Sequence, residues 1–128
     1  MGQIRSAKDL VVYQRGYELA MDIFLASKKF PPEEKYSLTD QIRRASRSVC
    51  ANLREAWAKR RYEAHFLNKL TDCDAENGEV ETWLSFAFDC GYLSKEDHAR
   101  LQAKCMEVGK MLGTMIVNSG PFILPSAR

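Results

Sequence analysis

Several features that define other protein classes are missing from this sequence of 128 residues. It has no apolar run near the roughly 18 residues of a membrane-spanning helix, and its first residues lack the apolar stretch of a secretory signal. No segment alternates polar and apolar residues for long, and no glycine-rich phosphate loop is present. We therefore expect a cytoplasmic protein without strands and without membrane association.

Cysteine and histidine are too few and too scattered to predict a metal centre. The four cysteines are Cys50, Cys73, Cys90 and Cys105, with no C-x-x-C pair among them. We expect them to be reduced and mostly buried. The acids Asp72, Glu76 and Glu79 could approach one another, but the Glu-x-x-His motif of carboxylate-bridged bundles is absent. We expect neither a metal nor another cofactor.

Apolar residues recur at helical spacing in four long segments. The expected helices cover residues 9–28, 38–60, 62–90 and 95–118, followed by an apolar tail at 119–128. Ser37 and Ser94 each precede an acidic residue by three positions, which predicts helix N-caps, and Gly91 is the expected stop of the third helix. Short connections between long helices predict an all-α, up-down-up-down antiparallel four-helix bundle that forms a single domain, residues 1–128.

Each expected helix has one apolar seam for the core. On the first helix we predict Leu10, Tyr13, Tyr17, Ala20 and Phe24. On the second we predict Ile42, Ala45, Val49, Leu53, Ala56 and Trp57. The third and fourth seams are Phe66, Leu70, Cys73, Asn77, Val80, Leu84 and Ala87, and Leu101, Cys105, Val108, Leu112 and Met115.

Charge is distributed unevenly along the chain. Residues 40–61 contain seven basic and two acidic residues, whereas residues 62–90 contain one basic and seven acidic, although the whole chain carries only +2. At about 100° per residue, four arginines of the second helix fall within about 40° of one another. These are Arg43, Arg47, Arg54 and Arg61, with Trp57 between them and the apolar face.

This arginine stripe has two interpretations. Its guanidinium groups could pair with carboxylates of the acidic third helix, and such surface pairs are common and worth roughly 0–1 kcal/mol each. Alternatively, a row of arginines beside an aromatic ring can bind phosphates and stack on bases. The candidate nucleic-acid-binding residues are Arg43, Arg44, Arg47, Arg54, Lys59, Arg60 and Arg61.

The third helix carries a second apolar line, formed by Trp83, Phe86 and Cys90. It could belong to a wide buried stripe, or it could be an exposed patch that a second copy covers. The tail adds three large apolar residues between two prolines, namely Phe122, Ile123 and Leu124. We expect Trp83, Phe86 and this tail to form an oligomer interface.

An enzyme is not predicted, because no nucleophile has an evident base. The two histidines, His65 and His98, lie near helix starts. Ser48, Asn52 and Glu55 share one side of the second helix, and we interpret them as a buried hydrogen-bonding network that fixes helix register. A structural adaptor that binds another protein, and no nucleic acid, remains the alternative to a nucleic-acid-binding protein.

The segment FPPEEKYSLTDQIRRASRSVCANLREA resembles the signature of small four-helix-bundle proteins encoded in intervening sequences of bacterial 23S ribosomal RNA genes. The matching positions are Phe30, Pro31, Glu34, Tyr36, Leu38, Thr39, Gln41, Arg43, Arg44, Ala45, Ser48, Val49, Asn52 and Glu55. The chain has Ala56 where the family usually has glycine, and DCDAENG where the family has small residues in the third helix.

The resemblance implies a homopentamer of four-helix bundles arranged as a barrel. A branch similar in fold is the accessory variability determinant of diversity-generating retroelements, which binds nucleic acid and a reverse transcriptase through basic surface. RNA or DNA, and a protein such as a reverse transcriptase, are thus the partners that the resemblance suggests. Members from ribosomal intervening sequences have no settled activity.

Overall fold

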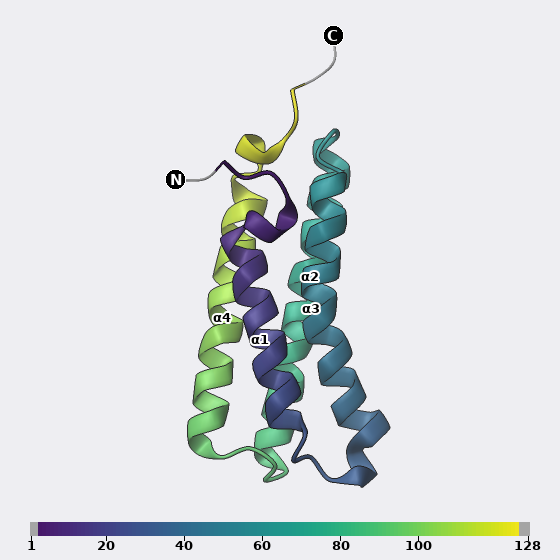
Figure 1. Cartoon of the computed structure of the whole chain (residues 1–128), viewed down its shortest axis with the longest axis vertical. Coiled ribbons are helices and arrows are strands. Elements are labelled where there is room, and N and C mark those ends of the chain that lie inside the picture. Colours follow the sequence, from purple (N-terminus) through teal and green to yellow (C-terminus); the bar gives the residue numbers. More distant parts are fainter. Residues whose placement is uncertain (1–2, 126–128) are drawn as a thin grey trace.

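A computed structural model describes residues 3–125, which form four long helices and no strand. The helices are α1 (Val11–Ser27), α2 (Asp40–Ala58), α3 (Glu63–Asp89) and α4 (Lys95–Val117). A 3-10 turn at Ala7–Asp9 precedes them and another at Gly120–Phe122 follows (Figure 1). The predicted all-α fold is confirmed. None of the helices in this part of the chain is long and apolar enough to cross a membrane.

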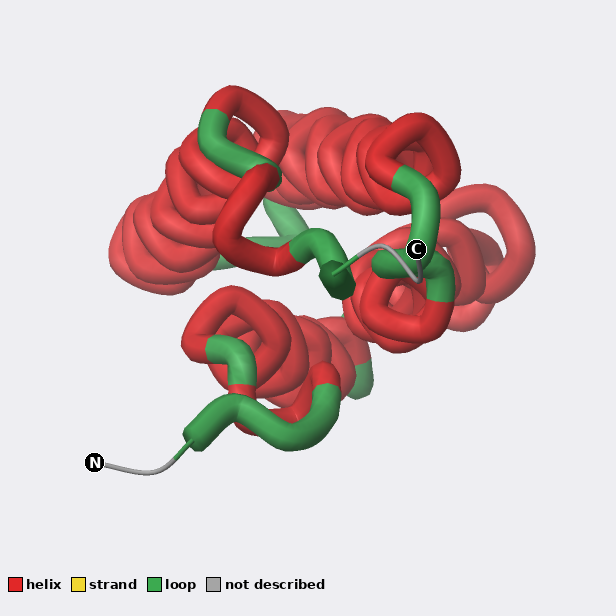
Figure 2. Tube along the Cα trace, turned by 90° about the horizontal axis from the view of Figure 1, so that it is seen from above, coloured by secondary structure: helices red, strands yellow, loops and turns green. Residues whose placement is uncertain are grey.

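The four helices form a closed antiparallel bundle. Each packs against its neighbours in the sequence, and α4 returns to pack against α1. Seen from above, all four surround one interior (Figure 2). As a result α2 lies between α1 on one flank and α3 on the other, which decides what its charged side chains meet.

The core follows the predicted seams on α3 and α4 fully, on α2 except for the half-buried Trp57, and on α1 only in part. All seven predicted residues of α3 and all five of α4 are buried. On α1, however, Tyr17 is 56% exposed, and the helix instead buries Val12, Leu19 and Ile23 alongside Ala20. Of the predicted residues of the first helix, Leu10 and Ala20 are buried, Tyr13 and Phe24 are half-buried, and only the prediction for Tyr17 is wrong.

Small residues explain which line of α1 turns inward. Gly16 lies on the buried line, and a Cβ atom there would already lie 3.5 Å from side-chain atoms of Val49 and Cys50. Ser27, also on this line, is almost fully buried. Because these positions lack bulk, the backbone of α1 approaches α2 closely, which a face of Tyr13 and Tyr17 would prevent.

The predicted stop of α3 and the predicted start of α4 are confirmed. Gly91 adopts φ 83°, its N–H donates to the Phe88 carbonyl at 2.9 Å, and the Tyr92 N–H donates to the Ala87 carbonyl at 2.8 Å. This pair of bonds is a Schellman motif, which favours glycine at the left-handed position. At α4, the Ser94 hydroxyl accepts from the Asp97 N–H at 3.0 Å.

The predicted cap of α2 at Ser37 is wrong. The chain enters α2 through a 3-10 turn (Pro32–Glu34) and a wide π-type turn (Lys35–Thr39). Inside this helical entry the Ser37 hydroxyl donates to Glu34 Oε1 at 2.6 Å, and the Tyr92 hydroxyl donates to Glu34 Oε2 at 2.9 Å. These two hydrogen bonds hold the pKa of Glu34 below its ordinary value. Glu34 thereby ties the start of α2 to the α3–α4 connection.

Asn77 supplies a buried polar contact between α3 and α4, and it generates a stability prediction. Its Nδ2 donates to the Cys105 carbonyl at 3.0 Å, and the Cys105 thiol lies 3.4 Å from Asn77 Oδ1. We expect Asn77→Ala to lower the free energy of unfolding by about 1–3 kcal/mol, because buried partners lose their hydrogen bonds. Urea denaturation followed by circular dichroism measures the change.

Asn68→Ala is the matched control, since Asn68 is exposed on the same helix. Both substitutions change helix propensity alike, so their difference isolates the buried contact. Equal urea midpoints for the two variants would contradict the role assigned to Asn77.

Candidate nucleic-acid interface

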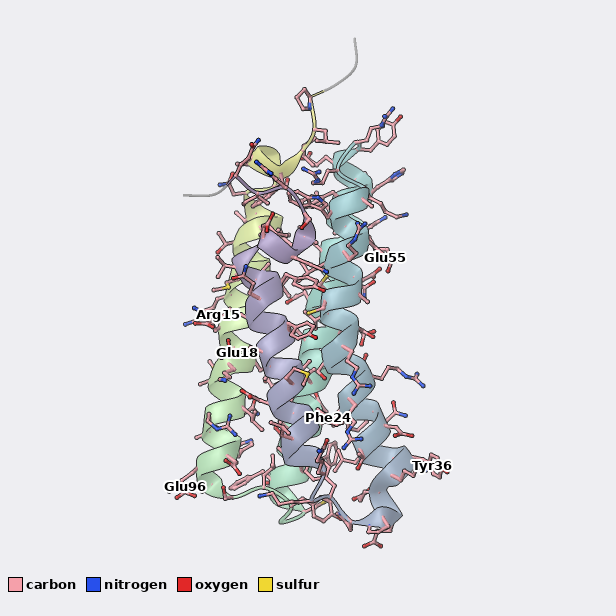
Figure 3. The ribbon with its side chains drawn as sticks, viewed as in Figure 1. Arg15, Glu18, Phe24, Tyr36, Glu55 and Glu96 are labelled. Atoms are coloured by element: carbon pink, nitrogen blue, oxygen red, sulfur yellow. The ribbon has the colours of Figure 1, made fainter. Side chains whose placement is uncertain are left out.

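The arginine stripe of α2 faces α1 and not the acidic helix α3. The Arg43 guanidinium lies 4.9 Å from the centre of the Phe24 ring, and that of Arg47 lies 5.9 Å from the same ring. Figure 3 places Phe24 between α1 and α2. Within one chain, the described residues therefore show no pairing of this stripe with carboxylates of α3.

None of the seven candidate basic residues has a carboxylate oxygen within 4.0 Å in the range 3–125. The basic residues that do form ion pairs there are Arg15, Lys69, Arg100 and Lys104. Arg44 faces α3, where its charge lowers the pKa of Glu76, but burial of Glu76 is the larger effect and raises it. The positive charge of α2 is thus left without close partners.

The acids of α1 are engaged elsewhere. Asp22 pairs with Lys104 and with Arg100, and Glu18 pairs with Lys104 at 3.2 Å. Arg15 also binds Glu107 of α4 at 3.3 Å. Figure 3 shows Arg15 and Glu18 on the α4 side of α1, away from α2. This network draws the carboxylates of α1 to α4, so among residues 3–125 neither acid of α1 pairs with an arginine of α2.

Arg43 is the stripe residue most firmly held by the fold. Its Nε donates to the Ser27 hydroxyl oxygen at 2.7 Å, and that hydroxyl in turn donates to the Phe24 carbonyl at 3.0 Å. Ser27 is buried, so this hydrogen bond joins α1 and α2 beneath the protein surface. Arg43 therefore stabilises the bundle and has less freedom to bind a ligand than its neighbours.

The three basic residues at the end of α2 lie in a turn, because the helix ends at Ala58. Arg61 therefore does not continue the stripe by helical spacing, although it is exposed. Arg60 lies 3.5 Å from the Trp57 ring centre and donates from Nε to the Trp57 carbonyl at 2.8 Å. Burial lowers the pKa of Arg60. Its carbonyl accepts from the Leu124 N–H at 3.0 Å.

A groove of about 440 Å³ runs between α1 and α2 beside the stripe. Its lining consists of Tyr13, Tyr17, Ala20, Met21, Arg47, Cys50, Ala51 and Arg54. The two tyrosine rings stack with their centres 6.3 Å apart and their planes 25° apart. Two arginines that form no ion pair within residues 3–125 therefore line the groove with two aromatic rings and an otherwise apolar floor.

The titratable groups that line the floor and back wall of this groove are neutral. The Cys50 thiol donates to the Tyr13 carbonyl at 3.6 Å, and burial raises the pKa of Cys50 to about 11. The pKa of Tyr13 is also raised, chiefly by burial. Both groups stay neutral near pH 7, so the groove offers binding surface and no activated nucleophile.

A second hollow of about 470 Å³ lies on the outer face of α2. It is lined by Asp40, Arg43, Arg44, Arg47, Ser48 and Ala51. Arg47 borders both hollows, so the basic surface is continuous from the α1–α2 groove to the outside of α2.

The predicted polar network is only partly formed, and it lies at the surface. Lys69 of α3 donates to Asn52 Oδ1 at 3.3 Å and to Glu55 Oε2 at 3.4 Å. Glu55 is exposed and points away from the bundle (Figure 3), so the prediction of a buried network is wrong. Ser48 is half-buried, and its hydroxyl makes no hydrogen bond with these groups in the described part of the chain.

The described residues bring together no constellation typical of catalysis. His65 packs edge-on against Tyr62, and His98 stacks on Phe88 at 4.4 Å. Between residues 3 and 125, no three His, Cys, Asp or Glu side chains are placed to hold a metal ion.

The predicted interface residues divide into two groups. Phe86 is 54% exposed, and the half-buried Trp83 lies beside it with ring centres 6.0 Å apart. In the tail, the Phe122 ring lies tilted beside that of Phe66, with ring centres 6.1 Å apart, and Ile123 also packs against the core. Phe122 and Ile123 therefore close the end of their own bundle, whereas Leu124 stays exposed.

Tyr13 and Tyr17 line the groove, although their spacing in the sequence predicts core positions for both. The signal that could have found them is the second apolar line of α1. Tyr17, Met21 and Leu25 recur every four residues, parallel to the core line, and all three are exposed.

Comparison with known proteins bears on the whole bundle. The sequence matches a family model described as 23S rRNA-intervening sequence protein over residues 8–114. The fold is similar to the crystal structure of a protein of unknown function from the S23 ribosomal protein family of Bacteroides thetaiotaomicron VPI-5482. The TM-score is 0.75 and the identity 31%, covering 83% of this chain and 98% of that chain. No curated protein matches the sequence.

The different settings of the arginines predict different effects on stability. We expect Arg43→Gln to lower the free energy of unfolding by about 1.5–3 kcal/mol, because it removes a charged hydrogen bond to the buried Ser27. Arg54→Gln should change it by no more than about 0.5 kcal/mol, as is usual for exposed positions. Urea titration of both variants checks this, and a smaller loss for Arg43→Gln than for Arg54→Gln would refute the structural role of Arg43.

Proposed function

The chain belongs to the family of 23S rRNA-intervening sequence proteins, and we propose that it is a non-catalytic, oligomeric protein that binds the backbone of RNA or DNA through α2. One observation carries this proposal. Seven basic side chains of residues 43–61 lie without an ion-pair partner in the range 3–125, although an acidic helix is adjacent. We place this activity in the bacterial cytoplasm, where RNA and DNA are available.

The chemistry of the stripe fits phosphate better than it fits a structural role. Arginine presents several N–H donors in a planar fork that matches phosphate oxygens, and it is weakly hydrated. Arg47, Arg54 and Arg61 are exposed and free to make such contacts. Helix α3, with seven acids in residues 62–90, repels a polyanion. The nucleic acid is therefore expected to approach from the α1 side of α2.

Oligomerisation is part of the proposal, since one stripe neutralises only a few phosphates. A ring of identical subunits repeats the stripe in each copy, and linked weak sites bind with avidity. The exposed Phe86 beside Trp83 is the surface that favours self-association. Homopentamers and a reverse-transcriptase partner remain predictions from the resemblance. A structural adaptor without nucleic-acid binding is the competing function, and the salt experiment below separates the two.

Binding to the backbone predicts a strong dependence on salt. Each phosphate contact contributes about −0.7 to −0.9 to the slope of log affinity against log salt concentration. Replacing Arg54 and Arg61 together by glutamine removes two phosphate contacts and should therefore flatten the slope by about 1.4–1.8. The affinity for every nucleic-acid sequence should fall to the same extent. Fluorescence anisotropy with a labelled RNA hairpin and a labelled DNA duplex, between low and moderate salt, measures this slope.

The matched control is Arg15→Gln with Arg100→Gln. These residues carry the same total charge, but they form ion pairs on the α1–α4 side. Their replacement should leave the slope unchanged. If the wild type binds neither probe at low salt, α2 is merely a charged surface and the adaptor function is preferred.

Self-association through α3 gives a second prediction. Phe86→Glu, and to a lesser extent Trp83→Glu, should dissociate the assembly, because a charge would be buried in an apolar contact. Light scattering should show a smaller particle while circular dichroism retains the helical signal. Val117→Glu is the control, since Val117 is 90% exposed and lies on α4, away from this pair. A wild-type monomer at micromolar concentration would exclude the oligomer.

A further inference from the structure

The groove between α1 and α2 has features that a backbone-binding surface does not need. We propose that it is a base-stacking subsite for single-stranded nucleic acid, in which a base lies on the Tyr17 ring and its flanking phosphates contact Arg47 and Arg54. This inference rests on the proposed function and specifies the form of nucleic acid that this surface takes.

The aromatic wall of the groove has the geometry of a stacking platform. Tyr17 is 56% exposed, which leaves its ring available to a ligand. The half-buried Tyr13 ring lies behind it at 6.3 Å and limits the positions that Tyr17 can adopt. Bases stack on such rings with little regard to sequence, because every base has a π face. The groove volume of about 440 Å³ is within the range of roughly 300–1,000 Å³ typical of small-ligand sites.

The opposite wall supplies charge of one sign only. Arg47 and Arg54 are seven residues apart on α2, about 10.5 Å along the helix axis, so a strand that follows the groove can meet both. No acidic residue lines the groove, and the carboxylates Glu18 and Asp22 of α1 are paired on the far side with Lys104. An anion with an aromatic component is the ligand that this combination favours.

A single strand fits this arrangement better than a duplex. In a duplex the bases are stacked on each other and cannot lie flat against a ring at the side of a groove, whereas the bases of a single strand can turn outward. A second copy of the chain is the competing occupant of this groove. The experiment distinguishes that occupant from nucleic acid.

The test compares probes of equal charge with and without bases. Labelled oligothymidylate and oligouridylate of about 12 nucleotides are titrated with the full chain, beside a 12-residue strand made only of abasic units. Wild type should bind the two base-containing strands roughly fivefold to a hundredfold more tightly than the abasic strand. A preference for either base-containing strand over the abasic strand supports the subsite.

Two variants and one control assign the preference to the groove. Tyr17→Leu should abolish the difference between the base-containing and abasic strands, and Tyr17→Phe should keep it, since only the ring is needed. Tyr36→Leu is the control, because Tyr36 is 73% exposed and lies outside the groove (Figure 3). Light scattering of each variant shows whether the assembly is intact.

Each adverse outcome has its own meaning. Equal binding of base-containing and abasic strands by wild type, or an unchanged preference in Tyr17→Leu, overturns the subsite and leaves backbone binding standing. Failure of every strand, hairpin and duplex to bind overturns the subsite together with the proposed function. If light scattering shows a smaller particle for Tyr17→Leu than for the wild type, a second copy occupies the groove, and this also overturns the subsite.

Discussion

Burial of the apolar face of α2 between α1 and α3 is the interaction on which the rest of the molecule depends. Ile42, Val49 and Leu53 are almost completely removed from solvent, and the glycine of α1 at position 16 allows the helices to come close. Because side chains on a helix keep fixed angular positions, burying this face also fixes both flanks. Packing in the core therefore decides where the positive charge of the surface lies.

The second decisive arrangement is the pairing of α1 with α4. Lys104 and Arg100 hold Asp22, and Arg15 holds Glu107, so the acids and bases between these two helices compensate one another. Individually such exposed pairs contribute little to stability. Their larger effect is on the composition of the neighbouring surface, because the α1–α2 groove is left with arginines and aromatic rings and no carboxylate.

The fold could be predicted from the sequence because helical periodicity is a local property. The seams of α3 and α4, the stop at Gly91 and the cap at Ser94 all depend on residues a few positions apart. The choice between the two apolar lines of α1 could not be predicted in this way, since it depends on how closely Gly16 lets another helix approach.

The surroundings of the site were harder to predict, for a geometric reason. The angles of Arg43, Arg47 and Arg54 about α2 follow from the sequence, but the neighbour on that flank depends on whether the bundle turns left or right. One hand places α3 beside the arginines and the other places α1 there. The structure has α1 on that side, and among residues 3–125 these arginines form no ion pair with α3. Arg61 was misplaced for a simpler reason, since α2 ends three residues earlier than the stripe requires.

The separation of basic and acidic residues onto neighbouring helices makes each bundle an electric dipole across its width. With a net charge of only +2, the molecule is weakly drawn to a polyanion as a point charge, but in the proposed binding this dipole adds a torque that turns α2 toward the polymer and α3 away from it. Orientation therefore precedes contact, which shortens the search for a productive encounter. Added salt suppresses this torque beyond a Debye length of about 8–10 Å, so the rate of capture depends on ionic strength as well as the affinity.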